Sequence, residues 1–305
     1  MSRLARLVRI VPESLEAYAA ALPREEIEKA EATSFPDVGG DEETLVAFVL
    51  TLDAINYGSG YFPHLKKRAG ASGYRTIEAA LREHFQASGP LSADDLAAMD
   101  AERVARLLSQ DPAEQPIAEL MRLYAESWRD LGELVGRRSR ASFCALVASA
   151  AGSGEALVRT LLEMPLYRDI AHYGGFDVPF LKRAQLTVAD LALALPTSHG
   201  RFCDLPRLTI FADNLVPHVL RTDGVLEYAP ELLSRIERAE LIQPGSAEEV
   251  EIRACAVQAV ELLVARLRQR GSTATAARLD HWLWARGALP RYKARPRHRT
   301  RSTYY

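Results

Sequence analysis

Apolar and polar residues alternate along the chain mostly with a helical period. Apolar side chains recur three and four residues apart in several long segments, and no series of alternating strand-like segments is present. The predicted helices cover residues 41–56, 76–88, 94–110, 116–135, 142–150, 154–164, 181–195 and 249–270. Residues 205–213 form a short apolar run that is typical of a strand. The pattern therefore predicts an all-α fold with at most one short, irregular strand-like segment.

The length and the linkers indicate a simple domain organisation. A chain of 305 residues makes one large domain or two of medium size. No repeat of the length used by helical solenoids is present, and the Gly- and Pro-containing linkers are short. We therefore predict a single helical domain over residues 1–305, composed of two packed lobes at about residues 1–140 and 141–305.

Composition excludes several classes of protein. The net charge of −2 argues against a surface dedicated to nucleic acid, and no apolar run is long enough to span a membrane. Three well-separated cysteines form no CxxC pair, and no dinucleotide, Walker or zinc-protease motif is present. We therefore expect a cytoplasmic, monomeric protein that uses neither a metal nor another cofactor.

The stretch LTIFADNLVPHVL, residues 208–220, ends an apolar run at a carboxylate. In an extended backbone, Phe211 and Asp213 point to the same side. Asp213 could cap the helix that follows, or it could be held in a pocket to do chemistry. The two roles can coexist.

Two further stretches place aromatic or charged groups at suggestive spacings. In LDHWLWARG, residues 279–287, Asp280 and Trp284 lie one helical turn apart and suit a flat, cationic ligand. The alternative is that the tryptophans belong to the core and Asp280 is an exposed neighbour. In residues 52–65, glycines flanked by Tyr57 and Tyr61 form either a ligand-binding loop or an ordinary helix end.

Positive charges gather at two places. Lys182 and Arg183 precede an apolar helix that contains Asp190, which indicates either a functional site or a structural ion pair. The tail from Arg291 to Arg301 carries six Lys or Arg residues and no acid. Such a tail is usually solvated, but its closing tyrosines suggest that it docks, in which case its arginines and His298 could recognise a phosphate.

Taken together, these stretches resemble the queuosine salvage proteins, the queuosine 5′-phosphate N-glycosylase/hydrolase family. The matching runs, all between about residues 165 and 305, are YRD, FLKRAQLTVAD, LTIFADNLVPHVL, EVEIRACAVQAVELL, LDHWLW and HRTRSTYY. The resemblance implies an all-helical fold similar to DNA glycosylases, and hydrolysis of queuosine 5′-phosphate to queuine and ribose 5-phosphate. The residue after Asp213 is Asn214, where we expect tyrosine in eukaryotic members.

The resemblance also implies roles for individual residues. The family's Phe–Ala–Asp motif falls on residues 211–213, and its aspartate and tryptophan fall on Asp280 and Trp284. Asp213 is expected to stabilise an oxocarbenium-like transition state. Asp280 would bind either the cationic amine of the queuine arm or the N–H edge of the base. The expected base walls are Phe211, Trp284 and Tyr61, and the candidates for the ribose and phosphate are Lys182, Arg183, His199, Tyr304 and Tyr305.

The sequence is also compatible with rival functions. One is a non-catalytic binding module for tRNA or a modified nucleoside, which would use the basic tail. Another is a glycosylase acting on a different purine-like nucleoside or on DNA. We expect a small nucleotide substrate and no stable complex with nucleic acid, because the overall charge is slightly negative.

Overall fold

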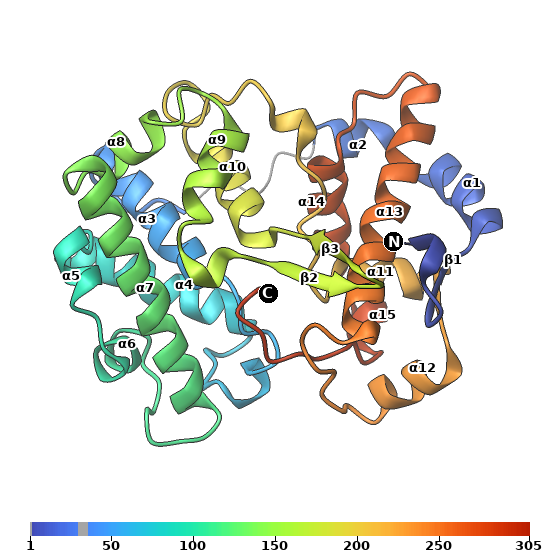
Figure 1. The fold of residues 1–305 in the computed structure, drawn as a ribbon, viewed down its shortest axis with the longest axis horizontal. Coiled ribbons are helices and arrows are strands. Elements are labelled where there is room, and N and C mark those ends of the chain that lie inside the picture. Colours follow the sequence, from blue (N-terminus) through green and yellow to red (C-terminus); the bar gives the residue numbers. More distant parts are fainter. Residues whose placement is uncertain (1, 30–35) are drawn as a thin grey trace.

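The computed structural model describes residues 2–29 and 36–305. In these residues the chain is built mainly of α-helices, with four short strands (Figure 1). The α-helices are α1 Pro12–Ala21, α2 Arg24–Glu28, α3 Glu42–Ala54, α4 Gly73–Ser88, α5 Ala93–Ala97, α6 Ala101–Leu107, α7 Ile117–Ser139, α8 Phe143–Ala148, α9 Gly154–Leu161, α10 Lys182–Ala194, α11 Val216–Thr222, α12 Pro230–Glu237, α13 Ala247–Gln269, α14 Ala276–Arg286 and α15 Pro290–Lys293. Short 3-10 helices occupy Ser2–Leu4, Phe62–His64, Pro165–Tyr167 and Leu205–Arg207. The strands are β1 Val8–Ile10, β2 Ile170–Tyr173, β3 Phe176–Pro179 and β4 Leu226–Tyr228.

The prediction of an all-α fold is confirmed, with one helix divided differently from the expectation. Residues 94–110 do not form a single helix, because the chain breaks between α5 and α6. Asp100 stands at the break, and its carboxylate accepts a hydrogen bond from the backbone N–H of Arg103 at 2.7 Å. An aspartate that caps the first turn of a new helix competes with continuation of the old one.

The strands lie outside the segment that the sequence favoured. β1 pairs antiparallel with β4, so that Val8 faces Tyr228, and β2 pairs antiparallel with β3. The β2–β3 hairpin turns at Gly174 and Gly175, whose φ angles of 59° and 87° suit the two-residue turn that matches strand twist. Strands of three or four residues carry too little alternation to be recognised from the sequence.

The expectation of a strand at residues 205–213 was wrong. Residues 205–207 form a 3-10 helix, and residues 208–213 are irregular. Side chains replace a neighbouring strand as hydrogen-bond partners of this backbone. Gln185 of α10 accepts from the N–H of Thr209 at 2.9 Å, and Asp280 of α14 accepts from that of Phe211 at 3.0 Å. The backbone polar groups are thus satisfied by helices on either side.

Two hydrophobic clusters divide the described residues. The first is formed between residues 38 and 208, and the second combines residues 8–27 and Phe180 with residues 210–292. α8, α9 and α10, which follow residue 140, pack in the first cluster. In Figure 1 the two groups of helices form the left and right halves, and the chain end at Tyr305 lies between them. No helix in the described part of the chain is long and apolar enough to cross a bilayer.

Candidate functional site

Asp213 is held at the start of α11. Its Oδ1 accepts hydrogen bonds from the backbone N–H groups of Leu215, at 2.7 Å, and of Val216, at 3.1 Å. The carboxylate therefore caps the first turn of the helix, which is one of the two roles that the sequence suggested for Asp213. Both bonds end on Oδ1, and the residue remains partly exposed. The cap fixes the carboxylate while leaving Oδ2 available to a ligand.

The backbone that carries Asp213 is anchored by a buried arginine. Arg253 of α13 donates from Nε to the carbonyl of Ala212 at 2.9 Å and binds Asp169 through two nitrogens, at 2.9 and 2.5 Å. Its charge also faces Glu249, at 3.1 Å. Burial opposes the charge, but the carboxylates of Asp169 and Glu249 outweigh burial and raise the pKa of Arg253. The guanidinium stacks on Phe180, at 3.9 Å from the ring centre.

Asp280 is buried behind Phe211. Its Oδ1 accepts the hydrogen bond from Phe211, and burial together with the charge of Asp213 raises its pKa well above that of an ordinary carboxyl group. His281 packs edge-on against Phe211, with ring centres 5.9 Å apart, and burial lowers the pKa of its imidazole. The carboxyl groups of Asp213 and Asp280 thus have different environments. That of Asp213 accepts hydrogen bonds from the start of α11 and is partly exposed, and that of Asp280 is buried.

Lys182 enters the site from the other half of the molecule. It begins α10, and its ammonium donates to the backbone carbonyl of Asn56 at 3.0 Å. Burial lowers the pKa of Lys182, and the charge of Asp213 opposes this more than that of any other group. The preceding Leu181 has a left-handed backbone, with φ of 51°, which is costly for a branched residue. Asp169 stabilises this turn by accepting from the N–H of Lys182 at 3.1 Å.

Two buried carboxyl groups lie beside Lys182. Burial raises the pKa of Asp53 to about 6, and burial together with the charge of Asp53 raises that of Asp190 well above its ordinary value. The ammonium of Lys182 opposes both shifts. Burial raises the pKa of Tyr74 most, and both carboxyl groups raise it further. Tyr74 in turn packs edge-on against Trp284 at 6.4 Å, so α4 of one half meets α14 of the other here.

The tail closes the same region. The main-chain oxygen of Tyr305 accepts hydrogen bonds from the N–H groups of Gly58, at 3.0 Å, and Ser59, at 3.4 Å. A Cβ at Gly60 would overlap the carbonyl of Thr300, so only glycine permits this approach. The amide of Asn214 donates to Ser59 at 3.0 Å and to the carbonyl of His298 at 3.2 Å. Asn214 thereby joins the loop, the tail and the residue next to Asp213.

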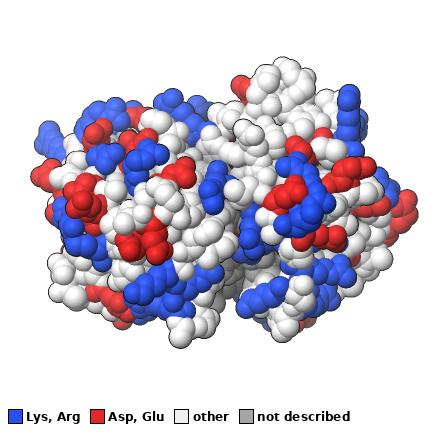
Figure 2. All heavy atoms as spheres, turned by 90° about the horizontal axis from the view of Figure 1, so that it is seen from below, with Lys and Arg blue, Asp and Glu red and all other residues white. Residues whose placement is uncertain are grey.

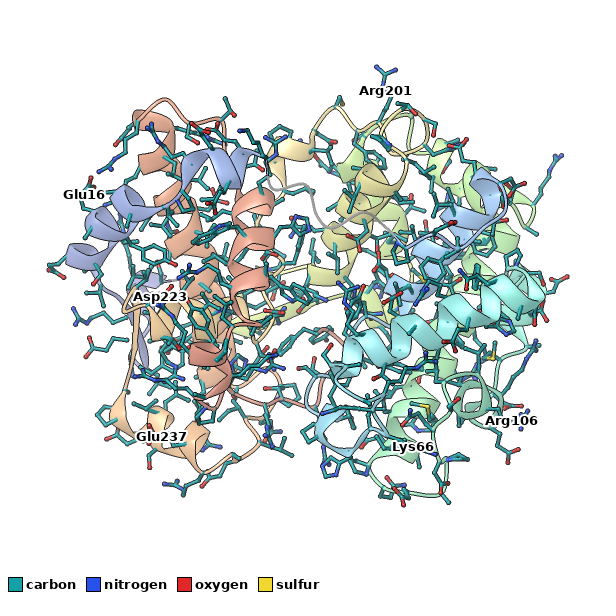
Figure 3. The ribbon with its side chains drawn as sticks, turned by 180° about the vertical axis from the view of Figure 1, so that it is seen from behind. Glu16, Lys66, Arg106, Arg201, Asp223 and Glu237 are labelled. Carbon is teal, nitrogen blue, oxygen red and sulfur yellow. The ribbon has the colours of Figure 1, made fainter. Side chains whose placement is uncertain are left out.

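The outer surface agrees with a site between the two halves. Figure 2 shows a groove between them on the face seen from below, with Lys and Arg side chains on both sides. In Figure 3, Lys66 lies on one half and Glu237 on the other.

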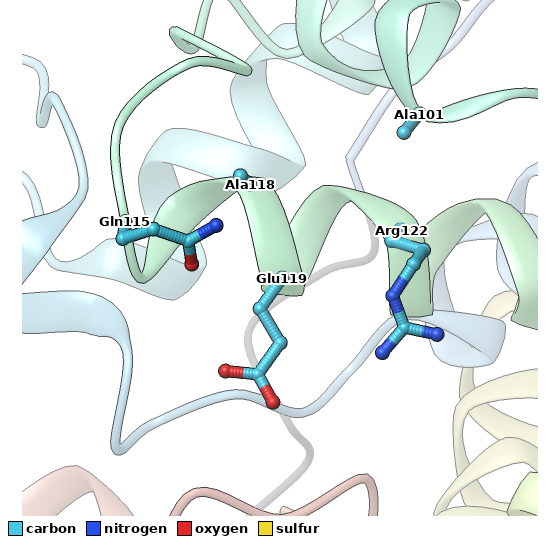
Figure 4. Close-up of a pocket in the computed structure, with 5 residues that line it drawn as sticks. All are labelled: Ala101, Gln115, Ala118, Glu119 and Arg122. Carbon is cyan, nitrogen blue, oxygen red and sulfur yellow. The ribbon is translucent and has the colours of Figure 1, made fainter.

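A separate hollow on the surface of α7 is lined by Ala101, Gln115, Ala118, Glu119 and Arg122 (Figure 4), and it contains none of the predicted site residues. Within residues 2–29 and 36–305, no group of three His, Cys, Asp or Glu side chains is arranged to hold a metal ion.

Comparison with known proteins identifies the family of this chain. The sequence model described as "Queuosine salvage protein" matches residues 36–305. The chain belongs to the queuosine salvage protein family. The resemblance noted for the C-terminal half therefore extends over most of the chain.

Several relatives are named queuosine 5′-phosphate N-glycosylase/hydrolase. A protein of Sphaerobacter thermophilus is 37% identical over 269 residues, covering 86% of this chain and 82% of the relative. A Bos taurus protein is 32% identical and covers 98% of this chain and 92% of the relative. A Mus musculus protein is 31% identical, covering 87% of this chain and 83% of the relative.

In this queuosine salvage family member, most of the predicted site residues converge. Asp213 lies next to Phe211 in sequence, Asp280 holds Phe211, and Trp284 follows one turn later on α14. Lys182 is close enough for the charge of Asp213 to oppose the lowering of its pKa by burial. Tyr305 reaches the site through its stacking on Arg253, with 4.8 Å to the ring centre. Tyr304, partly exposed, precedes it.

Three of the predicted site residues, Arg183, His199 and Tyr61, lie elsewhere. Arg183 is enclosed by Tyr57 and Tyr167, at 4.5 and 4.3 Å, and donates to the carbonyl of Ala54 at 2.5 Å. His199 pairs with Glu42 at 2.7 Å, at the opposite end of α3 from the Lys182 site. A helix of this length separates its ends by roughly 18 Å.

Tyr61, expected as a base wall, is buried against the first half. It lies under the guanidinium of Arg301, at 5.4 Å, and burial together with Glu119 raises the pKa of its hydroxyl to about 12. Tyr74 instead provides the aromatic neighbour of Trp284.

The sequence alone did not single out Tyr74, Asn56, Arg253 or His281. Arg253 left one usable signal, since Glu249 and Arg253 stand four residues apart in a predicted helix. His281 lies in the matched LDHWLW run. Tyr74 and Asn56 carry no such signal, because their contacts involve residues more than a hundred positions away.

Proposed function

We propose that this protein hydrolyses the N-glycosidic bond of queuosine 5′-phosphate and releases queuine and ribose 5-phosphate. Family membership and the names of the relatives support the reaction class. The observation that carries the proposal is the paired environment of Asp213 and Asp280. One carboxylate is fixed by two backbone N–H groups and partly exposed, and the other is enclosed directly behind Phe211.

In the proposed reaction, Asp213 faces the ribose. Positive charge develops on the sugar as the bond to the base breaks, and a fixed carboxylate stabilises that charge. Water supplies the oxygen that bonds to C1′, and the base departs with a proton. A deazapurine has no N7 to protonate, so more of the stabilisation must come from the sugar side. The hydrogen bonds to Oδ1 hold the carboxylate still, which avoids reorganisation during the reaction.

The base would lie among the aromatic side chains. Phe211 and Trp284 offer flat surfaces, and Trp284 is 38% exposed. Asp280 would read the polar edge of the base, because burial and the charge of Asp213 raise its pKa and so favour the protonated carboxyl group, which can donate as well as accept. Lys182, Tyr304 and Tyr305 remain our candidates for the ribose and phosphate. We propose that Arg183 stabilises the position of Lys182 and does not contact the substrate.

Incubating the purified protein with queuosine 5′-phosphate tests the proposal. Free queuine should appear without added metal. Asp213→Asn should retain ligand binding but lose turnover by about two orders of magnitude or more. Its amide oxygen can still cap α11, so the fold should survive.

Asp204→Asn is a matched control. Asp204 also caps a helix start, accepting from the N–H groups of Gly154 at 2.7 Å and Glu155 at 3.0 Å, but away from the site. The Asp204→Asn variant should keep full turnover. Equal activity of the Asp213 variant and wild type would make Asp213 a structural cap only.

We also propose a cytoplasmic monomer that forms no stable complex with nucleic acid. A steep, salt-dependent affinity for tRNA would contradict this part and favour a binding module instead.

A further inference from the structure

Asp169 joins the segment that carries Lys182 to the segment that carries Asp213. Its Oδ2 accepts a hydrogen bond from the backbone N–H of Lys182, at 3.1 Å, and another from Nη2 of Arg253, at 2.5 Å. The Nε of the same guanidinium donates to the carbonyl of Ala212 at 2.9 Å. One carboxylate oxygen and one guanidinium therefore link the first residue of α10 to the residue that precedes Asp213.

Asp169 lies where the chain passes between the two hydrophobic clusters. Tyr167 packs in the first cluster and Phe180 in the second. Between these residues the chain forms the β2–β3 hairpin, and β2 packs against α13 (Figure 1). The backbone carbonyl of Asp169 accepts from the N–H groups of Phe180, at 2.9 Å, and Leu181, at 3.2 Å. The backbone and the carboxylate of Asp169 thus both hold the start of α10.

The link between Asp169 and Arg253 leaves little room for movement. Both side chains are buried, and two nitrogens of the guanidinium bind the two oxygens of the carboxylate. Such a two-point contact fixes orientation as well as distance. The rings of Phe180 and Tyr305 lie against the guanidinium, at 3.9 and 4.8 Å. A shift of either partner would leave buried charge unpaired, so the link acts as a rigid spacer.

We infer that Asp169 is a positioning residue for the reaction, which acts through Arg253 to set where the carboxylate of Asp213 lies. This inference rests on the proposed function. Both oxygens of Asp169 already have protein partners, so the residue performs no chemical step itself. A displacement of about 1 Å at a reacting centre can lower a rate by roughly 100-fold. A rigid link to the backbone before Asp213 is therefore a requirement of turnover and not of stability alone.

The first test compares Asp169→Asn with Glu251→Gln. Glu251 is also buried, and it accepts from three backbone N–H groups of residues 6–8, at 2.6 to 3.1 Å, instead of from the segments at the site. Rates with queuosine 5′-phosphate are measured at a temperature at which melting curves show each protein folded. Asp169→Asn should lose about 10- to 100-fold in kcat, and Glu251→Gln should stay within about twofold of wild type. An equal loss of kcat in both variants would overturn the inference.

A double-mutant cycle gives a readout that a purely structural role would not change. Adding Asp169→Asn to Asp213→Asn should lower the residual turnover by less than about twofold, because the carboxylate that Asp169 positions is already absent. The same fold loss in the wild-type and Asp213→Asn backgrounds would contradict positioning through Asp213.

Asp169→Glu keeps the inference testable where Asp169→Asn does not fold. The longer side chain retains the charge opposite Arg253 and adds one methylene to the spacer, so the protein should fold while kcat falls about 10-fold or more. Wild-type kcat in this variant would overturn the inference. Failure of the wild type to release queuine would instead refute the proposed reaction, and the two failures are therefore distinguishable.

Discussion

The backbone N–H of Phe211 donates a hydrogen bond to Oδ1 of Asp280 at 3.0 Å, across 69 positions of sequence. This bond ties the irregular segment that carries Asp213 to α14. It also occupies one oxygen of a carboxyl group that is buried in the fold. The same contact thus orders the segment and makes the charge state of Asp280 important for stability.

Asp280→Asn should be more stable than wild type at neutral pH. Burial and Asp213 raise the pKa of Asp280 in the folded protein, so its contribution to stability is complete below about pH 4 and is lost as the pH rises through the folded pKa. Asparagine does not titrate and can still accept from Phe211. Melting temperatures from pH 4 to 9 should diverge in favour of the variant as the pH rises. A constant difference across that range would show that Asp280 is ionised in the fold.

Trp284→Leu should weaken substrate binding with little effect on folding. The side chain is 38% exposed, and stacking on a base contributes about 1–3 kcal/mol, so KM should rise roughly 5- to 150-fold. Leu289→Ala removes another exposed apolar side chain, 46% accessible, and should leave KM unchanged. Steady-state kinetics with thermal melts decide between the roles. A large fall in melting temperature with unchanged KM would assign Trp284 to the core.

Gly60→Ala should displace the tail from its loop. The added methyl group would overlap the backbone carbonyl of Thr300, which cannot move without breaking the contacts of Tyr305 with Gly58 and Ser59. We expect faster proteolysis within the last ten or so residues and reduced turnover. Gly136→Ala, in an open position on α7, should be neutral or stabilising by up to about 1 kcal/mol. Unchanged protease sensitivity of the Gly60 variant would mean that the tail docks independently of this approach.

Arg253→Met should destabilise the protein strongly. It leaves the buried carboxylate of Asp169 and that of Glu249 without their cation, and breaking a buried ion pair costs about 3–5 kcal/mol. Arg9→Met removes an exposed pair with Glu227 and should cost only about 0–1 kcal/mol. Urea denaturation of both variants measures the difference. Similar midpoints for the two would show that the buried network contributes no more than a surface pair.

Local sequence signals identified most of the longer helices, missed α1 and α12, and identified the strands poorly. The observed bounds of α3, α7 and α13 lie close to the predicted ones, and Asp100 shows why one predicted helix divides into α5 and α6. The run at residues 208–213 was misread because an apolar extended segment suggests a strand. Nothing local shows that Gln185, Arg253 and Asp280 will take the place of a strand partner.

Some residues of the candidate site could be predicted from the sequence, and others could not. Phe211, Asp213, Asp280 and Trp284 stand in short motifs whose spacing survives in the fold, so the sequence could name them. Lys182 was found by its position before an apolar helix, but the same argument also suggested Arg183, which packs between two tyrosines. Neighbouring residues at a helix start point in different directions, and the surrounding helices decide which of them faces the site.

By itself, the sequence determined the helical class, the family and the motif that holds Asp213, because periodicity and short motifs depend on neighbouring residues. Tertiary structure alone decided which groups meet around that carboxylate. Asn214 joins it to Ser59 and His298, and Tyr74 reaches Trp284 from the other half of the molecule. Such contacts depend on packing between distant segments, and burial there raises the pKa of Asp280.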